Sequence, residues 1–302
     1  MVTLIRPEGA RPEDMATTRR GLAGLFFAGY ALGAGPLSAE PIHTDSEGLI
    51  AEEVLIPQTD SPLPAYIARP DAPGRFAAIV VVSEVFGLHE YIRDICRRIA
   101  KVGYIAIAPA LFHRAGDPAP LSDFAKIQAI VETATNDQVE SDLSVTADWL
   151  HEQPFTNGRR MGITGFCWGG AAVWMTLAKL PQYRAGVAWY GRLSKPPAGQ
   201  FLADEHRPWP LDVVADLHGP VLGLYAGQDK GIPLTDVAAM RLALHDQGKR
   251  GSDIIVYPEA QHGFHADYRA ATYDAQAAAD GWNKMLEFFA ENGVGPRTPR
   301  RY

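Results

Sequence analysis

The sequence predicts a single α/β domain in which a mostly parallel sheet carries helices on both faces. Short apolar runs rich in β-branched residues alternate with segments whose apolar residues recur every three or four positions. This alternation is typical of a parallel sheet with crossover helices. The chain has 302 residues, of which 47% are apolar, enough to build one sizeable core. It contains no internal repeat that would indicate a solenoid or propeller.

The predicted strands are short and flanked by Gly, Pro or charged residues. They lie at residues 76–83, 104–110, 161–166, 185–190, 221–226 and 252–257. The first one, FAAIVVVS, is continuously apolar, as expected for a strand buried on both faces. Crossover helices are predicted between and after the strands, at residues 91–101, 139–151, 171–180, 234–246 and 268–290.

Two other segments complete the predicted domain. Residues 52–56 and 64–69 have the pattern of an antiparallel strand pair at the sheet edge. Residues 191–216 are rich in Pro and aromatic residues and have no clear period. A long irregular segment of this kind is often functional, so we expect it to cross the active-site face.

Charge and cysteine content argue against several classes of protein. Lys and Arg number 28 against 35 Asp and Glu, so the net charge of −7 lacks the basic excess that nucleic-acid binding requires. The two cysteines, Cys96 and Cys167, have neither a CxxC neighbour nor a metal-ligand spacing. We therefore expect no disulfide framework and no structural zinc. Cys96 shares a helical face with Ile92 and Ile99 and is expected in the core.

The first 39 residues differ from the rest of the chain. Arg19 and Arg20 precede a short apolar run at 21–35, which is followed by PLSA. Paired arginines before such a run indicate a twin-arginine-type export signal, with 40–302 as the mature domain in the periplasm or outside the cell. The run is shorter than the roughly 20 residues of a spanning helix, so no stable membrane span is expected. The alternatives are a membrane anchor, or a start at Met15 and a cytoplasmic protein.

A possible nucleophile lies in the phrase GFCWGG, between the predicted strand 161–166 and the predicted helix 171–180. A tight strand-to-helix turn with small residues two before and two after its central residue is a nucleophile elbow. Cys167 holds that central position, between Gly165 and Gly169. A helix N-terminus stabilises a thiolate through its dipole and free amides. The alternative is a buried structural cysteine in a glycine-rich turn.

An acid and a histidine follow in the order that an elbow nucleophile requires. Asp229 comes after strand 221–226 in AGQDKGIP, and His262 comes after strand 252–257 in EAQHGF. Because parallel strands end at one edge of a sheet, Cys167, Asp229 and His262 should lie together, in the chain order of the α/β-hydrolase fold. Taken singly, Asp229 is equally typical of a helix cap and His262 of a surface loop.

Two further residues near these positions bear on the site. His265, three residues beyond His262, is a rival for the role of base. Glu84 directly follows the most apolar strand, in SEVFG, where the oxyanion-forming loop of this fold belongs. Glu84 read alone is a solvated loop charge, but beside the elbow it could accept a hydrogen bond from the thiol.

The phrases SEVFGLHEYIRDICRRIAKVGYIAIAPALF, HRAGDP, GFCWGG, YAGQDKGIP and AQHGF resemble, in order, the motifs of the dienelactone hydrolases, or carboxymethylenebutenolidases. The resemblance runs from about residue 50 to about residue 290. It implies an α/β-hydrolase that cleaves a small ester or lactone through a thioester, without a metal or organic cofactor. It also implies Cys167 as nucleophile, His262 as general base and acid, and Asp229 as the residue that orients the histidine.

The same resemblance implies the surroundings of the nucleophile. The backbone amides of Val85 and Trp168 would form the oxyanion hole, Glu84 would help to activate the thiol, and Arg114 would bind a substrate carboxylate. Taken singly, Arg114 is equally typical of a solvated loop arginine. One position departs from the pattern: the best-known members carry a second arginine four residues after the catalytic histidine, where this chain has Ala266. The carboxylate clamp is therefore incomplete, which makes dienelactone itself a doubtful substrate.

Two alternative functions are kept. An elbow-cysteine redox or glyoxalase-like protein also pairs such a cysteine with a glutamate, but it lacks the downstream Asp and His. A non-catalytic exported binding protein on a hydrolase fold would not require the complete set of catalytic residue types.

Overall fold

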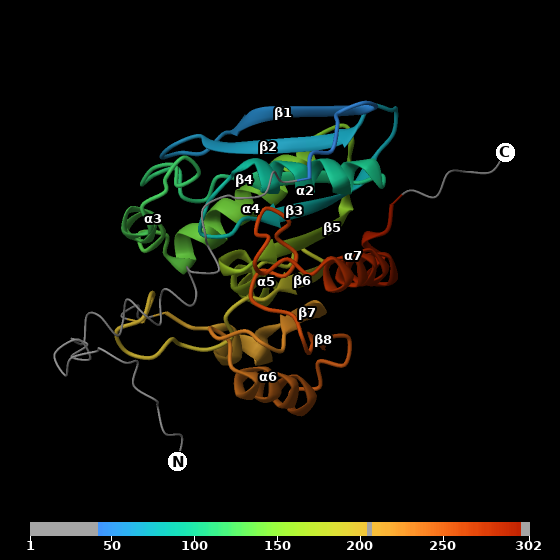
Figure 1. Ribbon diagram of the computed structural model, residues 1–302. Helices are drawn as coiled ribbons and strands as arrows, with labels where there is room; N and C mark the ends of the chain where they lie inside the picture. The colour runs from blue at the N-terminus through green and yellow to red at the C-terminus, as the bar shows by residue number, and fades with distance from the viewer. Residues whose placement is uncertain (1–41, 204–206, 297–302) are drawn as a thin grey trace, which may run out of the picture.

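The computed structural model describes residues 42–203 and 207–296, so the expected export segment 1–39 lies outside the described residues. The described residues form one sheet with the strand order β1-β2-β4-β3-β5-β6-β7-β8 (Figure 1). The strands are β1 (Leu49–Ile56), β2 (Leu63–Pro70), β3 (Phe76–Val82), β4 (Ile105–Pro109), β5 (Thr156–Phe166), β6 (Ala185–Trp189), β7 (Val221–Ala226) and β8 (Asp253–Tyr257).

Strand direction confirms the predicted fold class. From β4 to β8, every neighbouring pair in the sheet is parallel. β2 is antiparallel to both β1 and β4, as expected for the predicted pair at the edge. All seven residues of β3 are buried, which explains why its sequence is continuously apolar rather than alternating.

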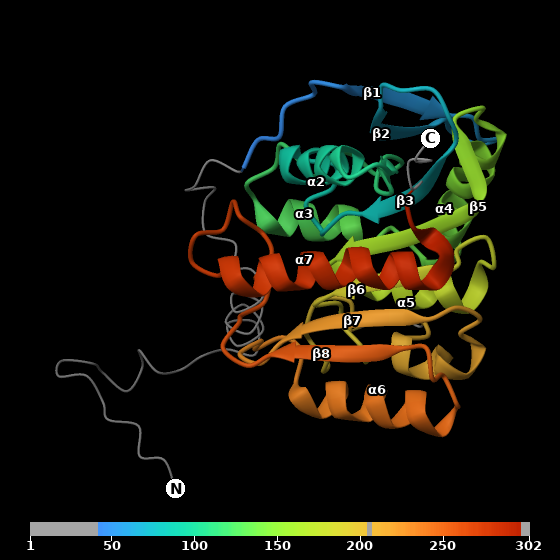
Figure 2. The same ribbon diagram turned by 90° about the vertical axis from the view of Figure 1, so that its right-hand side faces the viewer.

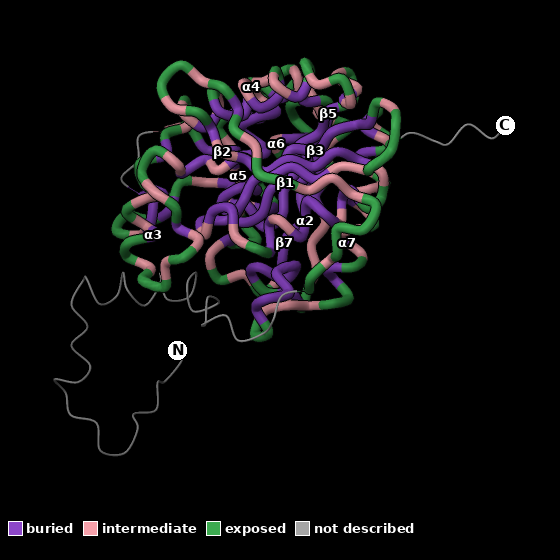
Figure 3. Tube along the Cα trace, turned by 90° about the horizontal axis from the view of Figure 1, so that it is seen from above, coloured by how far each residue is buried: buried purple, intermediate pink, exposed green. Residues whose placement is uncertain are grey.

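Helices cover both faces of this sheet. The helices are α2 (Glu90–Lys101), α3 (Phe124–Val131), α4 (Asn136–Glu152), α5 (Trp168–Lys179), α6 (Leu234–Asp246) and α7 (Ala275–Phe289). α2 and α7 lie in front of the strands in Figure 2, and α5 lies behind them. Buried residues run through the centre along the strands, and exposed residues gather on the outer loops and helix surfaces (Figure 3). The core thus lies on both faces of the sheet, between the strands and each layer of helices.

Among the helix boundaries that differ from the prediction, the starts of α5 and α7 matter for the site. α5 begins at Trp168, directly after Cys167, rather than at 171. α7 begins at Ala275 rather than at 268, because the Asp274 side chain accepts hydrogen bonds from the backbone of the first turn. Residues 268–274 therefore belong to the loop that follows β8 and not to a helix. α3 was not predicted, because its eight residues are too few for a strong periodic signal.

The described residues of the segment 191–216 form the expected excursion, which ends in a short 3₁₀ helix, η2 (Pro210–Asp216). η2 packs against α5 and α6, so this end of the excursion lies beside the helix that follows Cys167. A short π-helical turn, η3 (Ala290–Val294), continues α7. None of the helices in 42–203 and 207–296 combines the length and apolar character that a membrane crossing requires.

Candidate active site

The backbone of the elbow is strained at one residue. Cys167 joins β5 to α5 with φ 54° and ψ −113°, outside the regions that a non-glycine residue usually occupies. A Cβ atom on Gly169 would collide with the carbonyl oxygens of Val82 and Ser83, at the end of β3. Only glycine lets α5 approach β3 this closely, and the approach brings the Cys167 turn beside the residues that follow β3.

The acid and the histidine meet as predicted. Nδ1 of His262 donates to Oδ2 of Asp229 at 2.6 Å, and His262 also shares a hydrogen bond with Cys167. The other oxygen of Asp229 accepts the backbone N–H groups of Gly231 at 2.8 Å and Ile232 at 3.1 Å. Asp229 therefore orients the histidine and also shapes the turn before α6, so both interpretations of this carboxylate apply.

The charge state of His262 follows from these contacts. Burial alone would lower the pKa of His262, but the charges of Asp229 and Cys167 and the hydrogen bonds to both raise it to about 10. Cys167 and His262 are only 6% and 9% exposed, so water does little to weaken the interaction. At neutral pH the site therefore favours the imidazolium form of His262.

Glu84 is buried and is not a solvated loop charge. Its Oε2 atom accepts the hydroxyl of Tyr268 at 2.8 Å and contacts Nε2 of His89 at 3.0 Å. Burial acts to raise the pKa of Glu84, but the hydrogen bond and charge of His89, the charge of Arg269 and the Tyr268 hydroxyl bring it below its usual value. The side chain is therefore a carboxylate. The charges of Glu84 and Cys167 both raise the pKa of Tyr268 and that of Arg269. The carboxylate and the thiol therefore belong to one polar cluster.

Arg269 is a site residue that sequence reasoning missed. It is buried, and its guanidinium carbon lies 5.0 Å from the centre of the Phe86 ring and 5.5 Å from that of Tyr268. Its Nε atom is buried without a hydrogen-bond partner in the part of the chain that the structure describes. The sequence contained one indication of this residue, an arginine seven residues after His262. It was overlooked because residues 268–290 were predicted to form a helix rather than to begin with a loop near the site. Ala266, at the family's arginine position, is fully buried.

Tyr190 is a second site residue that sequence reasoning missed. Its φ of 37° is unusual for a residue with a bulky side chain, and its ring centre lies 5.2 Å from that of His262. Its hydroxyl is buried and has no hydrogen-bond partner among the described residues. Burial, followed by the charge of Glu84, raises the pKa of Tyr190, so the hydroxyl keeps its proton and can donate.

The two predicted oxyanion amides lie at the same edge of the sheet. Trp168 is the first residue of α5, and the first N–H groups of a helix have no partner within it. Val85 comes three residues after the end of β3, against which the first turn of α5 packs. This arrangement is compatible with the predicted pair of donors.

Arg114 does not join the cluster, and the expected substrate contact is corrected. Its guanidinium donates to both oxygens of Asp142 at 2.8 and 2.9 Å, to Asp60 at 2.7 Å and to Gln58 at 2.6 Å. These contacts tie the loop after β4 to α4 and to the β1–β2 connection. Because the donors of the guanidinium fork are occupied in this way, we assign Arg114 a structural role.

His265, the rival for the role of base, and Cys96, the second cysteine, are both buried core residues. Nδ1 of His265 lies 2.6 Å from the Tyr91 hydroxyl, and burial followed by the charge of Arg98 lowers its pKa to about 3. His265 is thus neutral and does not compete with His262. Cys96 is fully buried on α2, as predicted. Within 42–203 and 207–296, no cluster of His, Cys, Asp and Glu side chains is arranged to hold a metal ion.

An elbow that presents a cysteine, together with a hydrogen-bonded Asp–His pair from later strands of a mostly parallel sheet, defines an α/β-hydrolase. The Dienelactone hydrolase family matches residues 63–293 of this chain. The chain therefore belongs to the dienelactone hydrolase family, and the resemblance found in the sequence is confirmed.

Individual relatives agree with this assignment. The "Putative carboxymethylenebutenolidase" of Methylorubrum extorquens is 44% identical over 275 residues, which cover 90% of this chain and 92% of the relative. The protein of the same name from Escherichia coli (strain K12) is 42% identical over 284 residues, with 92% and 98% covered. The crystal structure of the "Putative Dienelactone Hydrolase" of Klebsiella pneumoniae superposes with a TM-score of 0.74 at 43% identity, covering 80% of this chain and 99% of that one.

Proposed function

We propose that this hydrolase cleaves a carboxylic ester or lactone through a thioester on Cys167. One observation carries the proposal: the buried chain of hydrogen bonds from Asp229 through His262 to Cys167, at the start of a helix. The relatives named carboxymethylenebutenolidase support an ester or lactone as the substrate class. A carboxymethylenebutenolide is one candidate within that class.

The chemistry follows from the positions of these groups. The thiolate of Cys167 attacks the carbonyl carbon, and the backbone amides of Val85 and Trp168 stabilise the oxyanion that forms. The C–O bond breaks as the His262 imidazolium gives its proton to the leaving oxygen. His262 then removes a proton from water, the resulting hydroxide attacks the thioester carbonyl, and the acid departs. The Cys167 sulfur leaves as a thiolate beside the reprotonated imidazolium, which returns the site to its starting state.

Glu84 has a proposed role in activation. The sequence suggests that Glu84 keeps Cys167 as a neutral thiol at rest and that substrate displaces the carboxylate, so that either Glu84 or His262 can take the proton. The cluster that Glu84 shares with Cys167 supports an influence of one charge on the other. The alternative resting state is an imidazolium–thiolate pair, in which His262, whose pKa is raised, carries the proton. The pH dependence of Cys167 alkylation decides between them, because a neutral thiol reacts slowly near pH 7 and a thiolate rapidly.

The thioester can be trapped directly. Enzyme mixed with p-nitrophenyl acetate and quenched in acid should carry one acetyl group on the peptide that contains Cys167, as read by mass spectrometry. A Cys167→Ala variant should carry none and should release no nitrophenolate above the background rate. Steady release of nitrophenolate by the alanine variant would contradict the proposal.

The same experiment separates the two alternative functions. A non-catalytic binding protein would release no nitrophenolate. A redox or glyoxalase-like protein would fail to turn over esters but would form a sulfenate or hemithioacetal on Cys167 with peroxide or an α-oxoaldehyde. The Asp229–His262 pair favours the hydrolase, because neither alternative chemistry explains an oriented general base at this position.

We also propose that residues 1–39 direct export, because the paired arginines and short apolar run precede the domain that carries the site. The mature protein should begin near Glu40 and should be recovered outside the cytoplasm. N-terminal sequencing of the native protein tests this. Recovery from the cytoplasm of a form that begins at Met1 or Met15 would contradict it.

A further inference from the structure

His89 occupies a helix N-cap but its side chain does not cap the helix. It directly precedes α2, and the imidazole makes no hydrogen bond to the first turn. N-cap positions favour Ser, Thr, Asp and Asn, whose short side chains accept from the free N–H groups of the helix. The imidazole turns instead toward Glu84, with Nε2 3.0 Å from Oε2 of the carboxylate. The side chain of His89 therefore serves the active-site cluster rather than the helix.

The backbone after β3 brings His89 back to a residue five positions earlier. The Gly87 N–H donates to the carbonyl oxygen of Glu84 at 3.1 Å, and the His89 N–H donates to that of Gly87 at 3.0 Å. Gly87 has a φ of 67°, and a Cβ atom there would lie 2.8 Å from Cγ of Pro118. Because only glycine suits both this backbone and this space, the turn holds His89 close to Glu84.

Three aromatic rings fix the imidazole. Its centre lies 5.1 Å from that of Tyr268 and 6.1 Å from that of Phe86, both in edge-on contacts. Tyr91 stacks on it at 5.9 Å. Packing of this kind restricts the imidazole to one orientation, so its hydrogen bond to Glu84 costs little additional side-chain entropy.

Glu84 is held through one of its two oxygens. Oε2 accepts the Tyr268 hydroxyl as well as the His89 contact, whereas Oε1 accepts no hydrogen bond from the described residues. Because an ionised carboxylate has no hydrogen to give, Nε2 of His89 is the donor. Two donors on Oε2 fix the direction of the carboxylate and leave Oε1 available for a proton.

Other titratable groups surround the carboxylate without making a second contact of this kind. Those that interact electrostatically with it are Tyr91 on α2, Tyr190 after β6, and His265, Tyr268 and Arg269 in the loop after β8. Among the described residues, only Tyr268 joins His89 in donating a hydrogen bond to it. His89 is therefore the nitrogen donor on which the carboxylate depends.

We propose that His89 is a positioning residue for activation of the nucleophile: it holds the Glu84 carboxylate through Oε2, so that Oε1 can take the proton of Cys167. This inference rests on the proposed function, in which Glu84 helps to activate the thiol. The S–H bond of Cys167 breaks and an O–H bond forms on Oε1, while the hydrogen of His89 stays on Nε2. The proton returns to the sulfur once the thioester is hydrolysed. His89 acts only through the carboxylate.

His89→Phe tests the proposal, because phenylalanine keeps a ring in the aromatic packing and removes the N–H donor. With p-nitrophenyl acetate we expect kcat to fall about tenfold or more, the effect of losing a hydrogen bond to a charged group, while KM stays near the native value. His89→Gln, whose side-chain amide can donate in place of Nε2, should recover most of the lost kcat. His245→Phe is the matched control, because His245 contacts Asp246 at 3.1 Å on the exposed surface of α6. Its kcat should stay native.

A double-mutant comparison shows whether His89 acts through Glu84. In a Glu84→Gln background, His89→Phe should change kcat by no more than about twofold, because the carboxylate that it positions is already gone. Losses that add, or a native kcat in His89→Phe, would overturn the proposal. If hydrolysis still depends on Cys167, the proposed function stands. Loss of that dependence in the native enzyme would contradict the proposed function instead.

A spectroscopic measurement covers the case in which no ester is turned over. The ¹³C resonance of the Glu84 carboxylate, assigned by its absence in Glu84→Gln, reports protonation of this group as the pH is varied. Without the His89 donor the charged form is less stabilised, so the pKa of Glu84 should be higher in His89→Phe and native again in His89→Gln. The same titration in all three proteins would overturn the proposal.

The native protein alone provides a last test, which applies even if His89→Phe does not fold. ¹⁵N spectra of the histidine rings show which nitrogen carries the hydrogen, and the His89 signal is assigned by its absence in His89→Gln. Near neutral pH, Nε2 of His89 should carry a hydrogen, because the carboxylate can only accept. A bare Nε2 would overturn the proposal.

Discussion

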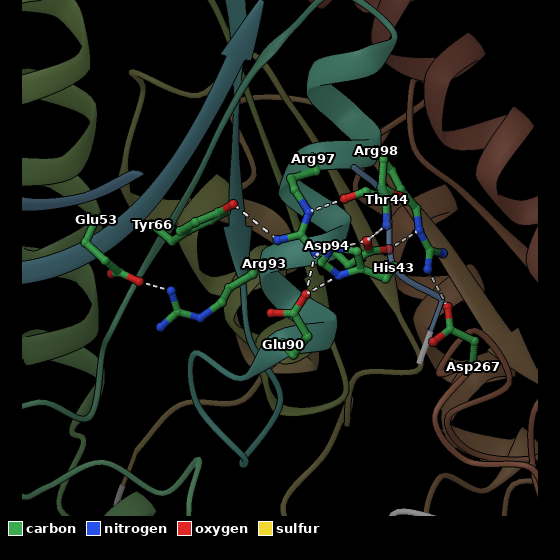
Figure 4. A network of polar contacts seen from close by, with 10 residues as sticks. All are labelled: His43, Thr44, Glu53, Tyr66, Glu90, Arg93, Asp94, Arg97, Arg98 and Asp267. Atoms are coloured by element: carbon green, nitrogen blue, oxygen red, sulfur yellow. Dashed lines mark hydrogen bonds and ion pairs between the residues drawn. The ribbon is translucent and has the colours of Figure 1, made fainter. Parts of the chain in front are cut away.

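Two buried polar clusters lie on either side of one short loop, and they differ in how completely their charges are paired. The first, called here the α2 network, consists of Glu90, Asp94, Arg97, Arg98 and Asp267 (Figure 4). The second, the active-site cluster, consists of Glu84, His89, Tyr190, Tyr268 and Arg269, beside Cys167 and His262. Asp267 and Tyr268 are adjacent in sequence, yet their side chains belong to different clusters.

The α2 network pairs every charged side chain with an opposite charge. Asp94 is fully buried and contacts Arg97 at 3.1 Å and Arg98 at 2.5 Å. Arg98 reaches Asp267 at 2.5 Å, so α2 is tied to the loop that carries His262. Arg97 also donates to the backbone oxygen of Thr44 at 2.7 Å, which fixes the segment before β1 against α2. The network therefore holds three separate segments in place.

The active-site cluster is less complete. Arg269 makes no ion pair in the described part of the chain, and its Nε atom and the Tyr190 hydroxyl lack hydrogen-bond partners there. Each such buried group costs about 1–3 kcal/mol of stability. The α2 network thus anchors the loop, and the active-site cluster keeps polar groups available to a substrate. Substitutions in the first should affect mainly stability, and substitutions in the second mainly activity.

The largest expected effect is on activity. Cys167→Ala should lower kcat by at least about 10⁴-fold, because the thioester pathway requires the sulfur. The unfolding midpoint should change little, since the strained elbow backbone is held by the glycines around it. Rates with p-nitrophenyl acetate and urea unfolding measure the two quantities. Cys96→Ala is the matched control: it removes a core thiol from α2 and should lower stability without lowering kcat.

The next effect concerns Glu84. Glu84→Gln should lower kcat by about 10²–10⁴-fold, the usual contribution of a positioned proton acceptor. The free energy of unfolding should stay close to the native value, because an amide oxygen can still accept the hydrogen bond from the Tyr268 hydroxyl. An unimpaired variant whose Cys167 is alkylated as rapidly as in the native enzyme would make Glu84 a bystander and reduce the functional cluster to Cys167, His262 and Asp229.

In the α2 network the expected effect is on stability. Asp94→Ala should lower the free energy of unfolding by roughly 3–5 kcal/mol, because two arginines lose their buried partner. Below the unfolding transition, kcat should stay near the native value. Glu53→Gln removes the ion pair with Arg93 at the exposed end of the same region, where Glu53 is 54% exposed. That change should cost no more than about 1 kcal/mol. Equal losses in urea unfolding for both variants would contradict the distinction.

The smallest effect is a pH dependence at His262. Its pKa is about 10 in the folded protein and about 6.5 in an unfolded chain. A raised folded pKa means that the stabilisation is fully present below about pH 6.5 and is lost as the pH rises toward 10. The difference in unfolding free energy between native protein and His262→Gln should therefore shrink by roughly 1.5–3 kcal/mol between pH 6 and pH 10. A difference that stays constant over this range would show that the imidazolium does not form.

Much of the fold and the core of the site could be predicted from the sequence. The continuous apolar run of β3 identifies a doubly buried strand, and the pattern of β7 and α6 gives their bounds to the residue. The order of Cys167, Asp229 and His262 then implies their proximity, because parallel strands bring their carboxyl ends to one edge. These inferences depend on local periodicity and on chain order, which a sequence contains in full.

Tertiary structure decided which charged side chains meet. Arg114 and Arg269 look alike in the sequence, yet Arg114 pairs with Asp142 on α4 while Arg269 enters the site from a loop. Glu84 and Tyr268, its hydrogen-bond donor, are 184 residues apart, and no local pattern links them. Burial, and with it the pKa of His265 and His262, depends on the packing of distant segments. The sequence by itself determined the strands, the elbow and the chain order of Cys167, Asp229 and His262, whereas packing determined the partners and the charge of the groups around them.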